Sequence, residues 1–203
     1  VLTGSGSNPT LNVTIATGTI ATPSLSGIET LNLSPEGAAR TVNLANATGV
    51  KTINVDNSQQ SLTVKNVAAL TDVGVKAGDG TADTLVQFAD SVVAGTADSI
   101  KLILQSNGNA DLASGQVINV RGTSTGGFET LNITATGTNR IGEILSDSAA
   151  TVGGAATATN SVKTINVSGD GSLRVDTALT TTTTCDASAN KGGVNVKLDN
   201  TGA

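Results

Sequence analysis

The stretch that decides the fold is GIETLNLS, residues 27–34, because the chain repeats it. Near copies read GVKTINVD at 49–56, GFETLNIT at 127–134 and SVKTINVS at 161–168. A catalytic motif is normally needed once, whereas a structural unit that buries its apolar face only against a copy of itself must recur. The repetition therefore favours a structural protein over an enzyme.

Apolar and polar residues alternate within each copy. In the first copy, Leu31 and Leu33 fall on one side of an extended chain and Asn32 on the other, which is the pattern of a half-buried strand. Weaker copies of the pattern open at Thr10, Thr41 and Ser61. Strand starts recur after about ten residues and the strong motif after about twenty, so each period carries two strands.

A unit of about twenty residues with two short strands and two turns matches one coil of a parallel β-solenoid, whose equivalent strands stack about 4.8 Å apart. Leu31 is then expected over Ile53, and Asn32 over Asn54 in an outward hydrogen-bonded ladder. The sequence therefore predicts an all-β fold, a parallel β-solenoid (β-helix) with coils of about 20 residues. We expect residues 1–203 to form a single elongated domain of about nine or ten coils, as a segment of a larger protein.

The position before the recurring threonine of the motif carries alternating charges in the four strong copies. The residues are Glu29, Lys51, Glu129 and Lys163. Unlike charges on neighbouring coils attract, so this alternation fits stacked coils, although ordinary polar turn residues explain it equally well.

Tandem antiparallel β-sandwich modules are the alternative architecture, because they also consist of short, regularly spaced strands. Against them, no Asn-Gly or Pro-Gly pair separates matched strands, and the only aromatic residues are Phe88 and Phe128. Residues 142–160 are rich in Ala, Thr and Gly and are expected to form a loop, so the predicted solenoid carries insertions.

Composition excludes several functions. The net charge is -5 with 11 basic residues and no Trp or Tyr, so nucleic acid is not an expected partner. The chain contains no His, which excludes a Ser/His/Asp triad, a Cys/His pair and a His-based zinc site. Cys185 is the single cysteine and is expected to be unreactive. No apolar run reaches the roughly 20 residues of a membrane span, and we expect no enzymatic activity.

Two glycine-rich turns are candidates for a cation site. Residues 77–90 read AGDGTADTLVQFAD, and GTAD recurs at 95–98. Asp79, Asp83 and Asp98 add carboxylates to turns rich in backbone carbonyls, the oxygen ligands that Ca²⁺ prefers. Aspartate-capped turns without metal explain the same residues. A third and weaker candidate turn carries Asp170 and Asp176.

The first of these turns resembles the RTX nonapeptide G-G-x-G-x-D-x-L/V-x. The matching residues are Gly78, Gly80, Asp83 and Leu85, with one extra residue between Gly80 and Asp83. Together with the tandem G-[IV]-[EK]-T-[LI]-N-[LIV] segments, this turn makes most of residues 10–200 similar to surface-layer and RTX-type surface proteins of Gram-negative bacteria. The resemblance implies an extracellular, cell-surface location, type I export without a cleaved N-terminal signal, and calcium-supported assembly.

We therefore expect a structural extracellular protein, a building block of a bacterial surface layer or surface polymer that assembles with calcium. Its expected partners are other copies of itself, in an oligomer or lattice, and cell-surface polysaccharide. An adhesin or phage-fibre stalk is the alternative function. A carbohydrate-active solenoid enzyme is disfavoured, because the carboxylates are scattered and aromatic sugar platforms are missing.

Overall fold

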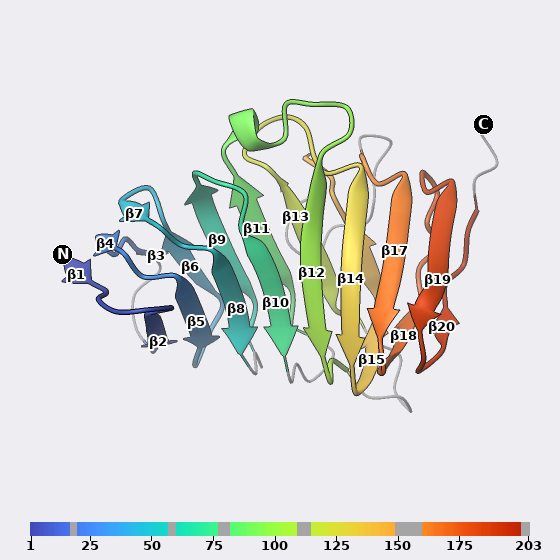
Figure 1. Cartoon of the computed structure of the whole chain (residues 1–203), viewed down its shortest axis with the longest axis horizontal. Helices are drawn as coiled ribbons and strands as arrows, with labels where there is room; N and C mark the ends of the chain where they lie inside the picture. The colour runs from blue at the N-terminus through green and yellow to red at the C-terminus, as the bar shows by residue number, and fades with distance from the viewer. Residues whose placement is uncertain (17–19, 57–59, 77–81, 109–114, 149–159, 200–203) are drawn as a thin grey trace.

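The computed structural model describes residues 1–16, 20–56, 60–76, 82–108, 115–148 and 160–199. In these ranges all ladders between named strands are parallel, and the one helical element is the 3-10 turn η1 (Asp90–Val92) (Figure 1). The all-β prediction is confirmed. Antiparallel sandwich modules require antiparallel ladders, which these strands do not form, so that alternative is wrong.

The largest sheet runs along the whole molecule and contains eight of the described strands (Figure 1). In chain order they are β2 (Thr10–Ile15), β5 (Thr30–Pro35), β8 (Thr52–Asp56), β10 (Asp72–Lys76), β12 (Ser99–Gln105), β14 (Thr130–Thr136), β17 (Thr164–Gly169) and β19 (Thr184–Asn190). Spatial order equals chain order, so the chain leaves this sheet after each strand and returns to extend it by one. Eight strands fall short of the predicted nine or ten coils, because the returns in the second half of the chain are longer.

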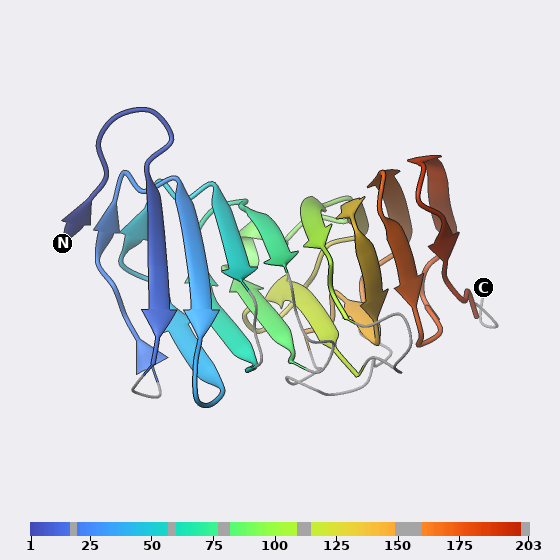
Figure 2. The same ribbon diagram turned by 90° about the horizontal axis from the view of Figure 1, so that it is seen from below.

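A second sheet stacks along the same axis and receives the chain between returns (Figure 2). Its six described strands are β3 (Ile20–Ala21), β6 (Arg40–Asn43), β9 (Leu62–Val67), β11 (Thr84–Phe88), β13 (Val117–Gly122) and β16 (Glu143–Leu145). The weak sequence copies at Thr41 and Ser61 correspond to β6 and β9 of this sheet, whereas the copy at Thr10 is β2 of the eight-stranded sheet. Each period therefore contributes a strand to both sheets in the first half of the chain.

Two short sheets of three described strands close the remaining side at opposite ends of the molecule (Figure 1). The first contains β1 (Leu2–Thr3), β4 (Leu25–Ser26) and β7 (Ala47–Thr48), and the second β15 (Thr138–Ile141), β18 (Ser172–Val175) and β20 (Val194–Asn195). In the first half of the chain the short strand follows the six-stranded sheet, while in the second half it follows the eight-stranded sheet.

The strand register follows the motif in the first half of the chain. Leu31 pairs with Ile53 and Asn32 with Asn54, as predicted. Tracing the Ile53 row onward through Val73 and Leu102 leads to Ile133, rather than to Leu131, the matching residue of the next motif copy. The two halves are thus displaced by two residues, which leaves every side chain on its original face because the side-chain period is two.

Inward-facing branched residues from all the sheets form one apolar core. The central members Ile53, Leu102 and Leu131 are fully or almost fully buried, and burial of each such side chain stabilises the fold by about 1.5–3 kcal/mol. The two phenylalanines meet inside this core. The rings of Phe88 and Phe128 lie 5.1 Å apart between centroids at 88°, in an edge-to-face contact.

The expected loop at residues 142–160 is wrong at its beginning. Glu143–Leu145 form strand β16, which pairs with β13, and all three residues are buried. Both faces of this short strand are covered, so its sequence does not alternate between apolar and polar residues and gives no strand signal. Residues 149–159 of the predicted loop lie outside the described residues.

Candidate functional site

Asparagine side chains form a ladder along the outward face of the eight-stranded sheet. Asn32 donates from Nδ2 to Oδ1 of Asn12 at 2.7 Å, and Asn54 donates in the same way to Asn32 at 2.8 Å. A second ladder joins Asn166 to Asn132 at 2.9 Å. These bonds confirm the predicted polar ladder and link neighbouring strands through their side chains as well as through the backbone.

Gly74 ends the first ladder. It occupies the next place after Asn54 in the same row, and a Cβ built at Gly74 would meet Oδ1 of Asn54. The amide of Asn54 thus occupies the space above Gly74, which has no side chain to continue the ladder. The second asparagine ladder lies in a different row of this face, because Gly74 pairs with Ile103 while Asn132 pairs with Lys101.

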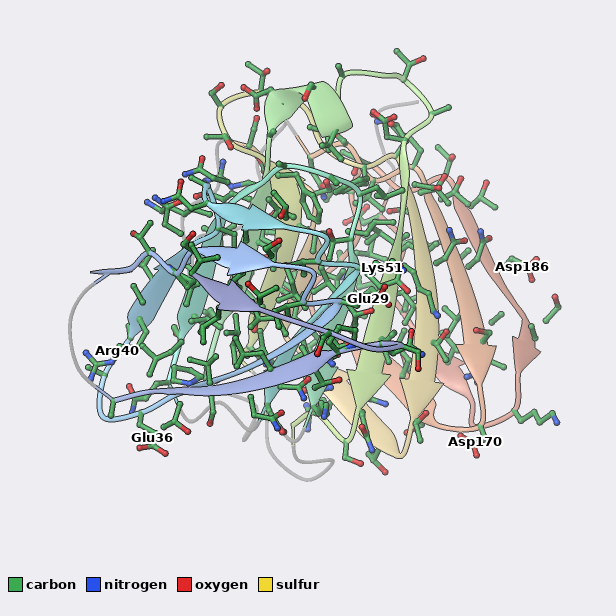
Figure 3. The ribbon with its side chains drawn as sticks, turned by 60° about the vertical axis from the view of Figure 1, so that its left-hand side comes forward. Glu29, Glu36, Arg40, Lys51, Asp170 and Asp186 are labelled. Atoms are coloured by element: carbon green, nitrogen blue, oxygen red, sulfur yellow. The ribbon has the colours of Figure 1, made fainter. Side chains whose placement is uncertain are left out.

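Charged side chains form ion pairs between successive strands. The alternation of Glu and Lys in the motif predicted one of these pairs. Lys51 Nζ lies 2.7 Å from Glu29 Oε1, and Figure 3 shows the two side chains together. Glu129 and Lys163 form no ion pair in the described ranges, and the Glu129 carboxylate accepts the backbone N–H of Asp98 at 2.8 Å. Exposed ion pairs of this kind contribute about 0–1 kcal/mol each, so they add little to the stability of the fold.

A shallow hollow of about 400 Å³ opens on the same outward face over β12, β14, β17 and β19. Its lining is polar where side chains project, with Lys101 on one margin, Asn132 and Asn166 in the middle and Asp186 on the other margin. Figure 3 shows Asp186 at the outer edge of the sheet. Sequence analysis did not identify this hollow, because it depends on four strands far apart in the chain.

Asp83, a predicted calcium ligand, lies at the start of β11. Its Oδ1 accepts the backbone N–H of Val117 at 2.8 Å, and its own N–H donates to Ser61 Oγ at 3.0 Å. Partial burial raises the pKa of Asp83, and the Val117 hydrogen bond opposes that rise. The neighbouring candidate Asp79 lies outside the described residues.

Asp98 lies at the start of β12, in the other long sheet. Its Oδ2 accepts the backbone N–H of Gly95 at 2.7 Å, which closes the second GTAD turn. Because β11 and β12 run in opposite directions, the starts where Asp83 and Asp98 lie are at opposite sides of the molecule (Figure 1). In the ranges that the structure describes, no three acidic, cysteine or histidine residues gather as a metal cluster.

The weaker candidate Asp176 holds two arginines. Its carboxylate accepts from Arg140 Nε at 2.8 Å and from Arg174 Nε at 2.6 Å. Partial burial acts to raise the pKa of Asp176, but the hydrogen bonds and positive charges of the two arginines outweigh burial and lower it. Asp170 is exposed at the turn between β17 and β18 (Figure 3). Asp176 is therefore engaged as a structural ion-pair centre.

Buried polar side chains on the outer face of the six-stranded sheet were missed by sequence reasoning. They are Gln87, Asn119, Arg121 and Glu143, and Asp147 lies just beyond the end of β16. Arg121 donates from Nη1 to the carbonyl oxygens of Gly122, Thr123 and Ser148, while its Nε is buried without a hydrogen-bond partner in the described ranges. Burial lowers the pKa of Arg121, and the negative charges of Asp147 and Asp90 partly offset this by raising it. No local signal distinguishes this arginine from one on an exposed face.

Cys185 lies on β19, where its side chain is half-buried. Burial raises the pKa of the thiol, and the nearby carboxylate of Asp186 raises it further. A thiol with a raised pKa carries little thiolate at neutral pH, so its nucleophilicity is low.

Comparison with family models, with curated proteins and with solved structures finds no match for this chain. In the described ranges no helix has the length and apolar character to cross a membrane. The parallel stack and its outward face are therefore the basis for assigning a function.

Proposed function

We propose that the chain is a parallel β-solenoid that serves as an extracellular building block of a bacterial surface layer or surface polymer. The observation that carries the proposal is the stack itself. Each passage of the chain adds one parallel strand to the same long sheet, so that strand order in space equals strand order in sequence. A chain that winds in this way builds a regular rod with repeating outward rows, which suits a scaffold.

The outward rows support a structural role. Asparagine ladders and ion pairs between strands stiffen the exposed face without assembling a reactive centre. We assign cell-surface polysaccharide and other copies of the chain as partners of this scaffold. Self-association by strand addition suits the outermost strands β2 and β19, each of which has one neighbour in its sheet.

Calcium support is part of the proposal, at the turns that carry Asp79, Asp83 and Asp98. Asp83 is partly buried and accepts one hydrogen bond from a described residue through Oδ1. A cation bound at its carboxylate would offset the desolvation that raises its pKa. Asp83 and Asp98 lie on different sides of the molecule, so we expect them to belong to separate calcium sites.

Assembly with and without calcium tests the proposal. We expect light scattering and negative-stain electron microscopy to show ordered assemblies in millimolar Ca²⁺ that disperse in EGTA, and the melting temperature to fall by about 5 °C on chelation. Asp83→Asn with Asp98→Asn should remove the calcium response, whereas Asp199→Asn, at an exposed site outside the turns, should retain it. Monodisperse protein with an identical melt in Ca²⁺ and EGTA would refute calcium-supported assembly.

A further inference from the structure

The hollow on the eight-stranded sheet has the form of a binding groove. It crosses β12, β14, β17 and β19 and encloses about 400 Å³. Short side chains occupy its middle, where Thr134 Oγ1 and Ser168 Oγ lie 3.3 Å apart, while Lys101 and Asp186 stand at the margins. A bulge in β19 places Ala189, instead of Ser188, opposite Ser168 at that margin of the groove.

Hydrogen-bonding capacity is left over inside the groove. In the ladder step between Asn166 and Asn132, one Nδ2 and one Oδ1 are used on each other. The other polar atom of each amide, Nδ2 of Asn132 and Oδ1 of Asn166, has no hydrogen-bond partner among the described residues. A donor and an acceptor therefore lie one strand spacing apart, about 4.8 Å. Such a pair suits the successive hydroxyl groups of a sugar chain, each of which both donates and accepts.

The charges around the groove disfavour an anionic ligand. Lys101 Nζ lies 3.5 Å from Asp72 Oδ2, which offsets its positive charge. At the other margin the backbone N–H of Ser188 donates to Asp186 at 2.9 Å, and together with the Ser188 hydroxyl it lowers the pKa of Asp186, which keeps this carboxylate charged. The margins therefore carry one cation and two anions. No aromatic ring lines the groove, so stacking does not contribute.

We propose that this groove binds a neutral, extended oligosaccharide segment that lies across the strands, with about one sugar unit per strand spacing. The inference rests on the proposed function for its biological setting, because it locates the polysaccharide contact of the scaffold. Hydroxyl contacts to Asn132, Asn166 and Asp186 hold the sugar chain. Without aromatic stacking each groove binds weakly, and a lattice of many copies gains strength through multivalency.

Titration of the full chain with cellotetraose, an extended neutral tetrasaccharide, tests the inference. We expect saturable amide NMR shifts confined to β12, β14, β17 and β19, with a Kd of about 1 mM. Tetragalacturonate, an acidic tetrasaccharide, should bind at least about fivefold more weakly because of the two carboxylates at the margins. Absence of saturation by cellotetraose at about 10 mM, shifts centred elsewhere, or tighter binding of tetragalacturonate would each overturn the proposal.

Matched variants locate the contact. Asn132→Ala removes one ladder bond and one groove amide and should raise the Kd about fivefold or more. Asn12→Ala removes one equivalent ladder bond outside the groove and should leave the Kd unchanged. Ala189→Arg should abolish binding by filling the groove while amide spectra elsewhere stay unchanged. An equal loss in the Asn12 and Asn132 variants would contradict the assignment. Because binding is measured on dispersed protein in EGTA, failure here leaves the calcium-assembly test unaffected.

Discussion

The first connections between strands of the eight-stranded sheet differ from most of the later ones in length and in the side on which a short strand forms. Strands β2, β5 and β8 follow each other at nearly constant intervals, and β1, β4 and β7 close the side of the stack. Between β10 and β17 the intervals lengthen, and from β17 to β19 the interval is short again. In this second region the closing strands move to the other side, and the outer face of the six-stranded sheet becomes buried. The eight-stranded sheet continues through both regions without interruption.

The difference teaches where a stacked fold tolerates change. Each strand of the long sheet must meet its neighbours along its whole length, so its length and face pattern are constrained. The connections between strands run over the surface and tolerate insertions. In the second region the insertions accompany a layer of buried polar groups, including Arg121 and Asp147, that the first region lacks in its described residues.

Removal of the buried arginine breaks this second layer and should have the largest effect. Arg121→Leu leaves three carbonyl oxygens without their donor and removes the positive charge next to Asp147. We expect a loss of about 2–4 kcal/mol in the free energy of unfolding, measured by urea denaturation.

Arg174→Leu is the matched control for that substitution, because Arg174 is half-exposed and pairs with a carboxylate that Arg140 also holds. It should cost less than about 1 kcal/mol. Equal losses in the two arginine variants would show that the buried polar layer does not distinguish the second region.

Acid should weaken the second region through Asp176. The folded-state pKa of this carboxyl lies below its ordinary value, so its contribution is complete above about pH 4 and is lost as the pH falls through the folded-state pKa. Asp176→Asn should lower the free energy of unfolding by about 1–2 kcal/mol at pH 7, and the deficit should shrink towards pH 2.5. Thermal melts across this pH range measure the difference.

Asp83→Asn is the contrasting variant, because the folded-state pKa of Asp83 is raised. The relative stability that a raised carboxyl pKa confers is present below the ordinary pKa and is lost as the pH rises through the folded-state value. Its deficit relative to the native chain should therefore not shrink in acid. A pH-independent deficit in Asp176→Asn would rule out ion pairing as the cause.

The smallest effect is expected at Gly74, where the first asparagine ladder ends. Gly74→Asn places a donor next to Oδ1 of Asn54 and extends the first ladder by one step, once the Asn54 amide turns slightly. We expect a gain of about 1 kcal/mol, from one hydrogen bond and reduced backbone entropy in the unfolded chain, seen as a higher urea midpoint. Gly74→Ala forces the same movement of the Asn54 amide and supplies no ladder bond, so it should be less stable than Gly74→Asn. If both variants are equally stable, the ladder bond contributes nothing at this position.

Much of the long sheet was predictable from the motif. The alternation around Leu31 assigned side chains to the core and to the surface correctly, and the pairs Leu31 with Ile53 and Asn32 with Asn54 occur as predicted. The calcium ligands remain a prediction: Asp83 and Asp98 lie in separate turns, and Asp79 lies outside the described residues. Sequence spacing alone carries no information on whether the residues of the two GTAD turns lie near each other.

The sequence by itself determined that the copies of the motif form strands, which face their side chains take and that strands of like pattern stack, because these follow from local alternation and repetition. Only the tertiary structure decided the two-residue displacement that puts Ile133 in the row of Ile53, because a shift of two preserves the alternation and leaves no mark on the pattern. It also decided the burial of Arg121 and the groove beside Asn166, because both arise from segments that are distant in the chain and adjacent in space.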